Sequence, residues 1–398
     1  MRLAYHILIR LYALLIRLAV PFSSKAKYWI SGRKQWLQKL PEAGTQNIVW
    51  FHCASLGEYQ QAKPLIKAIK ESRQNYQILL TFFSPSGYLN VGENENVDFQ
   101  SYMPLDTLSN ANEFVKKVKP VCAIFIQSEL WPNFLDVLRK KTIPTFVVSA
   151  NFKANSHLFK FFGKWHLKLL KSIHHFYVLD ESSQNLLQKN GIQQVSISGD
   201  NRYDKVIENR QNTKDIPYIV TFKGTQPLVV AGSTYKIDSK MLVRISKRMP
   251  NVKFIIAPHN TNYASELEQD GLLYSQANEN NVIDYNILII DNIGMLSQLY
   301  QYANLAYIGG AFGSGLHNIL EALAFDSPVI FGPNYHKFKE AKEAIIEGVA
   351  QSVSTEQELE SCINFFLENL TVDNKPSAFC MHRKGANDII MQGIKAVI

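Results

Sequence analysis

Residues 47–82 read NIVWFHCASLGEYQQAKPLIKAIKESRQNYQILLTF, with an apolar run at each end. The runs Asn47–Phe51 and Gln77–Phe82 predict β-strands, and Gln60–Ser72 between them has the pattern of a helix. A strand, a helix and a second strand at this spacing indicate a parallel sheet with covering helices. The sequence therefore predicts an α/β fold.

The same alternation continues along the chain and then starts again. In the first half it predicts a helix at Asn110–Val118 and further strands at Cys122–Ile126, Thr145–Ser149, Phe176–Leu179 and Val195–Ser198. In the second half it predicts strands at Pro227–Ala231, Lys253–Ala257, Ile287–Ile290, Leu305–Ile308 and Pro328–Phe331. We expect two Rossmann-like domains, 25–205 and 218–398, a polar linker over 206–217, and a ligand-binding cleft between the domains beyond the carboxyl ends of the strands.

The positive charge of the chain is concentrated at its N-terminus. The 398 residues include 42 Lys and Arg and 34 Asp and Glu, which gives a formal net charge of +8. Residues 1–40 contain eight basic residues and no acidic one, so the remainder has 42 − 8 = 34 basic against 34 acidic residues. A nucleic-acid-binding protein more often carries its charge on a folded face, and we therefore expect no nucleic-acid partner.

The N-terminal 24 residues are predicted to be a membrane anchor. Residues 3–20 read LAYHILIRLYALLIRLAV, in which Arg10 and Arg17 are about two helical turns apart and share one face. A helix in the membrane interface satisfies these arginines and buries the Leu and Ile side chains, whereas a central Arg in a spanning helix costs roughly 2.5–3.5 kcal/mol. A spanning helix and a core helix remain the alternatives. The basic residues that follow favour the cytoplasmic face of the membrane.

A second basic stretch fits the same interpretation. Residues 151–179 contain no acidic side chain, and Lys160, Lys164, Lys168 and Lys171 have the spacing of one helical stripe. The stripe is either the solvated face of an ordinary surface helix or a second contact with anionic lipid.

Two carboxylates follow strands in the first half. Ser55, Gly57 and Glu58 lie in the S-x-x-E pattern of a capping box after the first strand. Glu58 either caps the helix or acts as a general base, because a carboxylate at a strand-to-helix turn can accept a proton from an acceptor hydroxyl. Glu129 and Trp131 follow a later strand, ahead of a proline that fits the first turn of a helix.

In the second half the polar residues gather after three predicted strands. Ala231–Thr234 reads AGST, a weak phosphate-binding pattern, and His259 follows Lys253–Ala257. Residues 307–333 read YIGGAFGSGLHNILEALAFDSPVIFGP, in which four glycines form a loop that can wrap an anion with backbone N–H groups. The pattern is neither a dinucleotide fingerprint nor a P-loop.

Taken together, these motifs resemble the Kdo (3-deoxy-D-manno-octulosonic acid) transferase family of lipid A assembly. The resemblance rests on the basic N-terminal anchor and on six motifs in order: Phe51–Glu58, Pro104–Asp106, Glu129–Asn133, Gly199–Asp204, Ala231–Thr234 and Gly309–Pro333. It implies a GT-B fold and inverting transfer of Kdo from CMP-Kdo to a lipid A precursor at the cytoplasmic face of the inner membrane. It implies neither a cofactor nor a metal.

The resemblance also assigns roles to residues. Glu58 would be the general base, and Glu129 would support the acceptor side, to which Ser55, Gly57, Trp131 and Lys153 would also belong. The donor would be bound at its phosphate by Ser233, Thr234, His259 and Asn318 and at its ribose by Glu321, with Arg202, Gly310 and His317 completing the site.

The chain departs from the family pattern at several positions. The family's P-R-H is reduced to Pro258–His259, so its arginine is missing, and Arg202 replaces a customary lysine and is a candidate for the phosphate's cationic partner. The family's N-A-R is Asn151-Phe152-Lys153, and the glycine-rich loop is shorter, with Leu316 where glycine is common.

Two other classes of function stay open from the sequence. One is another GT-B sugar-nucleotide enzyme, similar to lipid A disaccharide synthase or to a UDP-sugar epimerase. The other is a non-catalytic membrane scaffold that keeps the fold.

Overall fold

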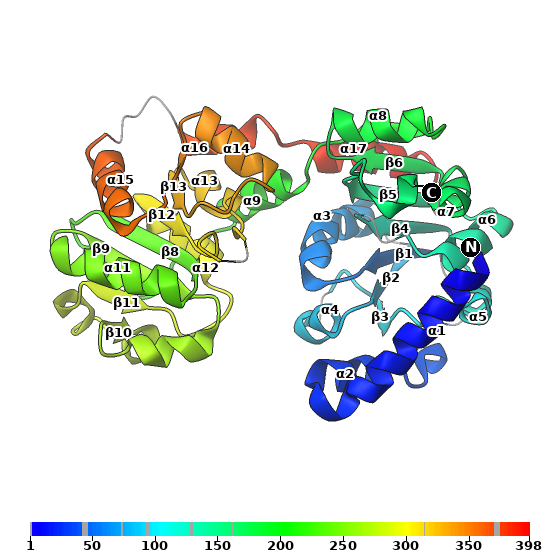
Figure 1. Cartoon of the computed structure of the whole chain (residues 1–398), viewed down its shortest axis with the longest axis horizontal. Helices are drawn as coiled ribbons and strands as arrows, with labels where there is room; N and C mark the ends of the chain where they lie inside the picture. The colour runs from blue at the N-terminus through cyan, green and yellow to red at the C-terminus, as the bar shows by residue number, and fades with distance from the viewer. Residues whose placement is uncertain are drawn as a thin grey trace. The chain divides into compact units, whose positions relative to one another are not determined.

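The computed structural model describes residues 2–41, 47–72, 75–92, 95–127, 130–160, 163–313, 315–369 and 375–398 (Figure 1). The chain forms two compact units. The first comprises Met1–Asn201 together with Gly385–Ile398, and the second comprises Arg202–Lys384. Each unit is an α/β structure built on its own parallel sheet, as the sequence predicts.

The first unit contains a seven-stranded sheet in the order β3-β2-β1-β4-β5-β6-β7, and every pair of neighbours is parallel. The strands are β1 (Asn47–Cys53), β2 (Tyr76–Phe82), β3 (Phe99–Tyr102), β4 (Cys122–Ile126), β5 (Thr145–Ala150), β6 (His175–Val178) and β7 (Val195–Ile197). Six of them were predicted to within two residues. The sequence analysis missed β3, a four-residue edge strand with Gln and Ser in its centre.

Helices cover both faces of this sheet. They are α3 (Leu56–Ser72), α4 (Pro85–Asn90), α5 (Leu108–Val118), α6 (Pro132–Lys140), α7 (Lys164–Leu170), α8 (Glu181–Lys189) and α17 (Ala386–Lys395). One face packs its apolar side chains against α5, α6 and α8, and the other packs against α3 and α17. The strands are buried on both faces, which explains their almost continuous apolar sequences.

Two further helices lie at the start of the chain. They are α1 (Arg2–Ala19), extended by a 3-10 turn at Val20–Phe22, and α2 (Ser24–Gly32). Only Ile9 and Ala13 of α1 are buried, so α1 is not a core helix. It is long and apolar enough to cross a membrane by length and composition.

The second unit contains another parallel seven-stranded sheet, in the order β10-β11-β9-β8-β12-β13-β14. Its strands are β8 (Leu228–Thr234), β9 (Lys253–Pro258), β10 (Leu272–Leu273), β11 (Ile287–Ile289), β12 (Leu305–Ile308), β13 (Val329–Phe331) and β14 (Ala350–Ser352). Its helices are α9 (Arg202–Gln211), α10 (Ile219–Lys223), α11 (Lys236–Arg248), α12 (Leu296–Leu299), α13 (Leu320–Ala324), α14 (Lys339–Ile346), α15 (Glu356–Glu368) and α16 (Pro376–Met381).

The structure corrects two of the predicted domain boundaries. Helix α9 spans Arg202–Gln211, so it includes the end of the predicted N-terminal domain and residues 206–211 of the predicted linker, and Tyr203, Val206 and Ile207 bury their side chains in the core of the second unit. The chain end returns to the first unit, where Ile390 and Ile394 of α17 join its core. The C-terminal domain therefore ends near residue 384 and not at residue 398.

Candidate active site

Each sheet has one point at which the strand order reverses. In the first unit it lies between β1 and β4, and in the second between β8 and β12. Ligands of open α/β sheets bind beyond the carboxyl ends of the strands at such points. The residues that follow β1, β4, β8 and β12 include most of those singled out in the sequence.

The turn after β1 holds Glu58 in the first turn of α3. The Glu58 carboxylate is 7% exposed, and its Oε2 accepts a hydrogen bond from the backbone N–H of Ala54. This is the contact expected of a capping glutamate. A Cβ built on Gly57 would meet only the Ser55 hydroxyl oxygen, at 3.9 Å, so packing within the described residues does not require glycine there.

Trp131 is held by a buried polar network at the same edge of the sheet. Its indole N–H donates to Nε2 of His52 (3.1 Å), and Nδ1 of His52 lies 2.9 Å from the Thr81 hydroxyl. Nε2 is an acceptor, so Nδ1 carries the proton and donates to Thr81. Burial, together with the nearby Arg33 charge, lowers the pKa of His52 to about 3, so the imidazole stays neutral and keeps Trp131 in place.

Asp106 joins two of the sequence motifs. Its carboxylate accepts from the backbone N–H groups of Asn133 (3.2 Å) and Phe134 (3.1 Å), in the first turn of α6. Its backbone oxygen accepts from the Asn133 side-chain amide (2.7 Å). Burial raises the pKa of Asp106 to about 6, against the opposing effect of these bonds. The Pro104–Asp106 motif therefore caps helix α6, which begins within the Glu129–Asn133 motif. Glu129 itself lies outside the described residues.

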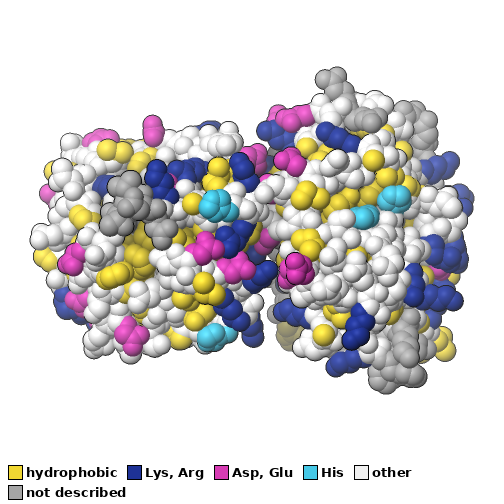
Figure 2. Space-filling view, turned by 90° about the horizontal axis from the view of Figure 1, so that it is seen from above, with side chains coloured by type: hydrophobic (Ala, Val, Ile, Leu, Met, Phe, Trp, Pro, Cys, Tyr) yellow, Lys and Arg dark blue, Asp and Glu magenta, His cyan; other side chains and the backbone are white. Residues whose placement is uncertain are grey.

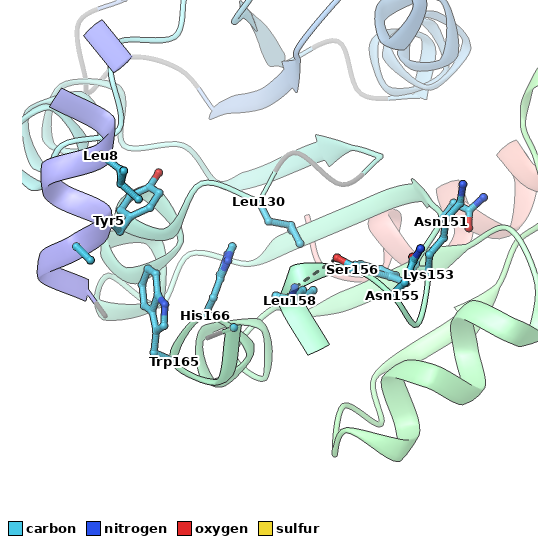
Figure 3. A pocket seen from close by; sticks show the side chains of 13 residues that line it. Tyr5, Leu8, Leu130, Asn151, Lys153, Asn155, Ser156, Leu158, Trp165 and His166 are labelled. Atoms are coloured by element: carbon cyan, nitrogen blue, oxygen red, sulfur yellow. Dashed lines mark hydrogen bonds between the residues drawn. The ribbon is translucent and has the colours of Figure 1, made fainter. Parts of the chain in front are cut away.

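A pocket of about 780 Å³ opens between α1 and the segment that follows β5. Its apolar wall includes Leu8 and Trp165, and Lys153 and His166 are among the polar residues that line it (Figure 3). Within the part of the chain that the structure describes, the Nε2 atom of His166 is buried without a hydrogen-bond partner, and burial lowers the pKa of this side chain to about 4. The pocket thus combines apolar surface with polar groups, as a site for an amphiphile requires.

The second basic stretch forms only part of the predicted stripe. Helix α7 begins at Lys164, after Lys160, and Lys168 and Lys171 are exposed. The contact of this stretch with lipid stays a prediction.

In the second unit, the end of β8 is tied to the end of β9. The backbone oxygen of Thr234 accepts from the N–H of His259 (2.9 Å), and the buried Thr234 hydroxyl accepts from Ser239 (2.9 Å). Ser233 has φ +53°, in the left-handed region that costs non-glycine residues energy. Gly309 directly follows β12. A Cβ there would lie 2.3 Å from the Ser233 backbone oxygen, so glycine is required where the end of β12 meets the end of β8.

Three rings stack beside this point. The His259 and His317 ring centroids are 4.6 Å apart, and Tyr235 stacks on His259 at 5.1 Å and on His317 at 5.7 Å. Burial and the neighbouring His259 lower the pKa of His317. The Nε2 atom of His317 is buried and no described residue forms a hydrogen bond with it, which makes it a candidate contact for a ligand.

The glycine N–H groups of the glycine-rich loop bond within the protein, and the binding of an anion by this loop stays a prediction. The fully buried Asp238 carboxylate accepts from the N–H of Gly310 (3.2 Å), from the N–H of Tyr235 (2.8 Å) and from the Tyr307 hydroxyl (2.6 Å). The N–H groups of Gly313 and Gly315 donate to the Gly310 oxygen, and that of Gly309 donates to Gly232. These amides are already engaged, because the loop closes on itself and on a carboxylate at the N-terminus of α11.

Glu321 and Asn318 pair at the start of α13. The Asn318 amide donates to Glu321 Oε1 (3.1 Å) and its oxygen accepts from Leu320 N–H (3.2 Å). Burial raises the pKa of Glu321 above its ordinary value, and the bond from Asn318 acts in the opposite direction. Helix α13 begins at Leu320, so His317 and Asn318 lie in the segment before the helix.

Arg202 forms an ion pair with Glu340 at 3.0 Å within the second unit. A cationic role for Arg202 toward a phosphate would have to coexist with this contact.

Sequence reasoning missed His52 and Asp238, and it quoted Asp106 without a role. Their importance comes from burial and from partners distant in the chain, which residue type alone does not reveal. The one available signal is that Asp238 lies in the first helical turn after a strand, where acidic residues favour the helix N-terminus.

Among the residues that the structure describes, no three His, Cys, Asp or Glu side chains gather as metal ligands do. On the face shown in Figure 2, Lys and Arg are mixed with Asp and Glu over the second unit. Over the first unit, Lys and Arg gather toward one margin. That the protein needs no metal stays a prediction, as does the absence of a nucleic-acid partner.

Comparison with known proteins shows what the chain is similar to. A family model described as 3-deoxy-D-manno-octulosonic-acid transferase (Kdo transferase) matches residues 30–205. A Kdo transferase of Haemophilus influenzae is 27% identical over 339 residues, which are 81% of this chain and 79% of that protein. The chain is therefore similar to Kdo transferases, which are glycosyltransferases, over most of its length.

Two other relatives extend this result. A Kdo transferase of Aquifex aeolicus is 26% identical and covers 82% of this chain and 88% of its own length. A bifunctional glycosyltransferase/methyltransferase of Fusobacterium nucleatum is 26% identical over 93% of this chain, which spans only 61% of that longer protein.

Solved structures share the fold at much lower identity. A UDP-GlcNAc 2-epimerase from Neisseria meningitidis has a TM-score of 0.58 at 12% identity, and the match covers 88% of this chain and 100% of that chain. MurG from Acinetobacter baumannii has a TM-score of 0.56 at 10% identity, with coverage of 88% and 99%. These likenesses show that the chain has a GT-B-like fold of two Rossmann-like units.

Proposed function

We propose that this chain transfers Kdo from CMP-Kdo to a lipid A precursor with inversion at the anomeric carbon. The observation that carries the proposal is that Glu58 follows β1, that Ser233 and Thr234 end β8, and that Gly310 follows β12, which are strands beside the strand-order reversals of the two sheets. Those on the first unit would serve the acceptor, and those on the second would serve the donor.

In the proposed reaction Glu58 is the general base. Its carboxylate takes the proton of an acceptor hydroxyl while the hydroxyl oxygen attacks the anomeric carbon of Kdo. The bond between that carbon and the CMP oxygen breaks, and CMP leaves with the electron pair. Two features support the assignment: Glu58 is largely buried at the carboxyl end of β1, and the Ala54 N–H fixes one of its oxygens.

The donor would be bound by His317, His259 and Asn318, with Glu321 at the ribose. Support comes from the buried, unpartnered Nε2 of His317 and from the stacked rings beside it. The engaged glycine N–H groups leave these side chains, with Ser233 and Thr234, as the groups available to polarise the phosphate.

The acceptor would enter the pocket between α1 and the segment after β5. Asn151 and Lys153 of this segment line the pocket, and Leu8 of α1 supplies apolar surface. A phosphorylated glycolipid fits this combination, with its anionic head at Lys153 and its acyl chains along α1.

Helix α1 would lie in the plane of the inner membrane on the cytoplasmic side. Its Arg2 pairs with Asp136 at 2.8 Å and its Tyr5 bonds Asp106, so one stripe of the helix is docked on the folded unit. The opposite face exposes seven large apolar side chains, at Leu3, Ile7, Leu8, Leu11, Leu14, Leu15 and Leu18. At about 1.5 kcal/mol each, their immersion contributes roughly 10 kcal/mol before the costs of association. A spanning helix would have to leave its docking partners.

A transfer assay tests the proposal. Detergent-solubilised full-length protein is incubated with CMP-Kdo generated in situ and a tetraacylated lipid A precursor, and the lipid is followed by mass spectrometry. We expect a mass gain of one or more Kdo units, with CMP competing against the donor and UDP failing to compete. No mass gain together with no CMP binding would contradict the proposal.

A further inference from the structure

A second pocket in the first unit is lined by cations without a carboxylate. It has a volume of about 440 Å³ and lies where α1, α2 and residues 104–110 meet. Arg17, Arg33 and Lys34 contribute to its lining, whereas none of the lining residues is acidic. Its remaining walls are largely apolar, with two tryptophans among them. Three positive charges around one small cavity repel one another, and a bound anion would offset this repulsion.

Arg33 is the fixed cation of this pocket. Its guanidinium donates to the backbone oxygens of Phe83 (2.6 Å), Met103 (2.9 Å) and Trp29 (3.1 Å), and it lies 3.9 Å from the Trp29 ring centroid. These three bonds leave two of its five N–H groups for another acceptor. Burial lowers the pKa of Arg33 to about 9, and among the described residues no carboxylate pairs with it.

Trp29 adds an independent observation. This side chain is 6% exposed and lines the pocket, yet its indole Nε1 is buried and has no hydrogen-bond partner among the described residues. Buried N–H groups are nearly always paired, because an unpaired one costs about 1–3 kcal/mol. Four residues that line the pocket therefore carry hydrogen-bond donors: Trp29, Arg33, Arg17 and Lys34. A ligand that has only acceptors would satisfy such donors.

The surroundings favour a lipid phosphate over a free one. Arg17 projects from α1 among Leu14 and Leu18, which are 48% and 63% exposed, and Phe22 at the end of that segment is 91% exposed. A soluble anion gains nothing from this apolar surface, whereas a lipid headgroup beside it would bury acyl chains against it. The phosphate of a lipid matches both parts of the site.

We propose that this pocket binds the phosphate group of an anionic membrane phospholipid, with Arg17, Lys34 and Arg33 as its cationic ligands and Trp29 as a neutral donor. The lipid would fix α1 in the interface as a bound component of the first unit. The site does not depend on the transfer reaction, and it is distinct from the pocket at Lys153 that we assign to the acceptor.

Calorimetric titration of the full-length protein tests the site. The probes are dihexanoyl phosphatidic acid and dihexanoyl phosphatidylcholine, both below their micellar concentrations, and inorganic phosphate. We expect phosphatidic acid to bind more tightly than either of the others. The double variant Arg17→Gln/Lys34→Gln should weaken its binding by about tenfold or more, because it removes two charged donors. Trp29→Phe keeps an aromatic side chain but removes the N–H donor, and it should weaken binding roughly threefold to tenfold.

A matched double variant provides the control. Arg10→Gln/Lys27→Gln also removes one Arg and one Lys charge from exposed positions, on α1 and α2, and neither residue lines the pocket. Its affinity for phosphatidic acid should change by less than about twofold. Both substituted pairs are exposed, so folding is preserved, and thermal unfolding verifies it.

Three results would overturn the proposal. Equal loss of affinity in the two double variants would mean diffuse surface charge and no built site. Equal binding of inorganic phosphate would make the ligand a soluble anion. Binding of a tetraacylated lipid A precursor without binding of phosphatidic acid would assign the pocket to the acceptor.

Discussion

The hydroxyl of Tyr5 donates a 2.6 Å hydrogen bond to Oδ2 of Asp106. The same carboxylate caps helix α6 through the N–H groups of Asn133 and Phe134. One buried acid thus joins the N-terminal helix to the start of the helix that follows Trp131. The position of α1 on the first unit and the shape of the Trp131 region are therefore set together.

Replacement of Tyr5 by Phe should loosen α1 without unfolding the unit. A hydrogen bond to a charged group contributes about 1.5–3 kcal/mol, so amide hydrogen exchange in α1 should become about tenfold faster or more. Tyr12→Phe is the control, because no hydrogen bond of the Tyr12 hydroxyl is found among the described residues and its side chain is 39% exposed. Equal exchange rates in α1 of the two variants would contradict a docking role for Tyr5.

Asp106 should make the first unit less stable as the pH rises. Its pKa is raised from 3.8 to about 6, so between these values the native state holds a proton that the unfolded chain has lost. Stability then falls with increasing pH, by about 3 kcal/mol across this window. We expect the free energy of urea unfolding of the wild type, relative to Asp106→Asn, to decline from about pH 4 to about pH 6. Parallel pH profiles would refute this assignment.

The sequence predicts the central strands well and the sheet edges poorly. Central strands such as Cys122–Ile126 and Leu305–Ile308 are wholly buried and apolar, so their bounds follow from the pattern. Leu272–Leu273 and Ala350–Ser352 are too short or too polar to stand out. The return of α17 to the first unit was unpredictable from local pattern, since it depends on which core accepts Ile390 and Ile394.

The candidate site is predictable where a residue acts near its place in the chain. Glu58 and the Gly309 turn follow strands directly, and the sequence points to both. The network of His52, Thr81 and Trp131 joins residues up to 79 positions apart, and the pairing of Tyr5 with Asp106 spans 101. Such contacts arise from strand order, which a single sequence does not reveal.

Gly309→Ala should disrupt the proposed donor site, whereas Gly313→Ala should not. A Cβ at Gly309 would lie 2.3 Å from the Ser233 oxygen and 2.7 Å from the Thr234 Cα, both backbone atoms that cannot move aside locally. At Gly313 the nearest contact is an ordinary 3.7 Å. We expect CMP affinity to fall about tenfold or more in the first variant and to stay near wild type in the second. Unchanged CMP binding by Gly309→Ala would separate this turn from the donor site.

The central claim is that Glu58 is the base of a Kdo transfer, and the most direct test is single-turnover Kdo transfer by Glu58→Gln beside Glu358→Gln. Glu358 is a matched control, because its carboxylate accepts from the N–H of Ser354 four residues earlier, as Glu58 does from Ala54. Both variants keep a side-chain oxygen that can accept the capping hydrogen bond, but only Glu58→Gln loses the proposed base. We predict that Glu58→Gln lowers the rate by roughly 10²–10⁴-fold while Glu358→Gln keeps the wild-type rate. Wild-type turnover by Glu58→Gln, or an equal loss in both variants, would contradict the assignment.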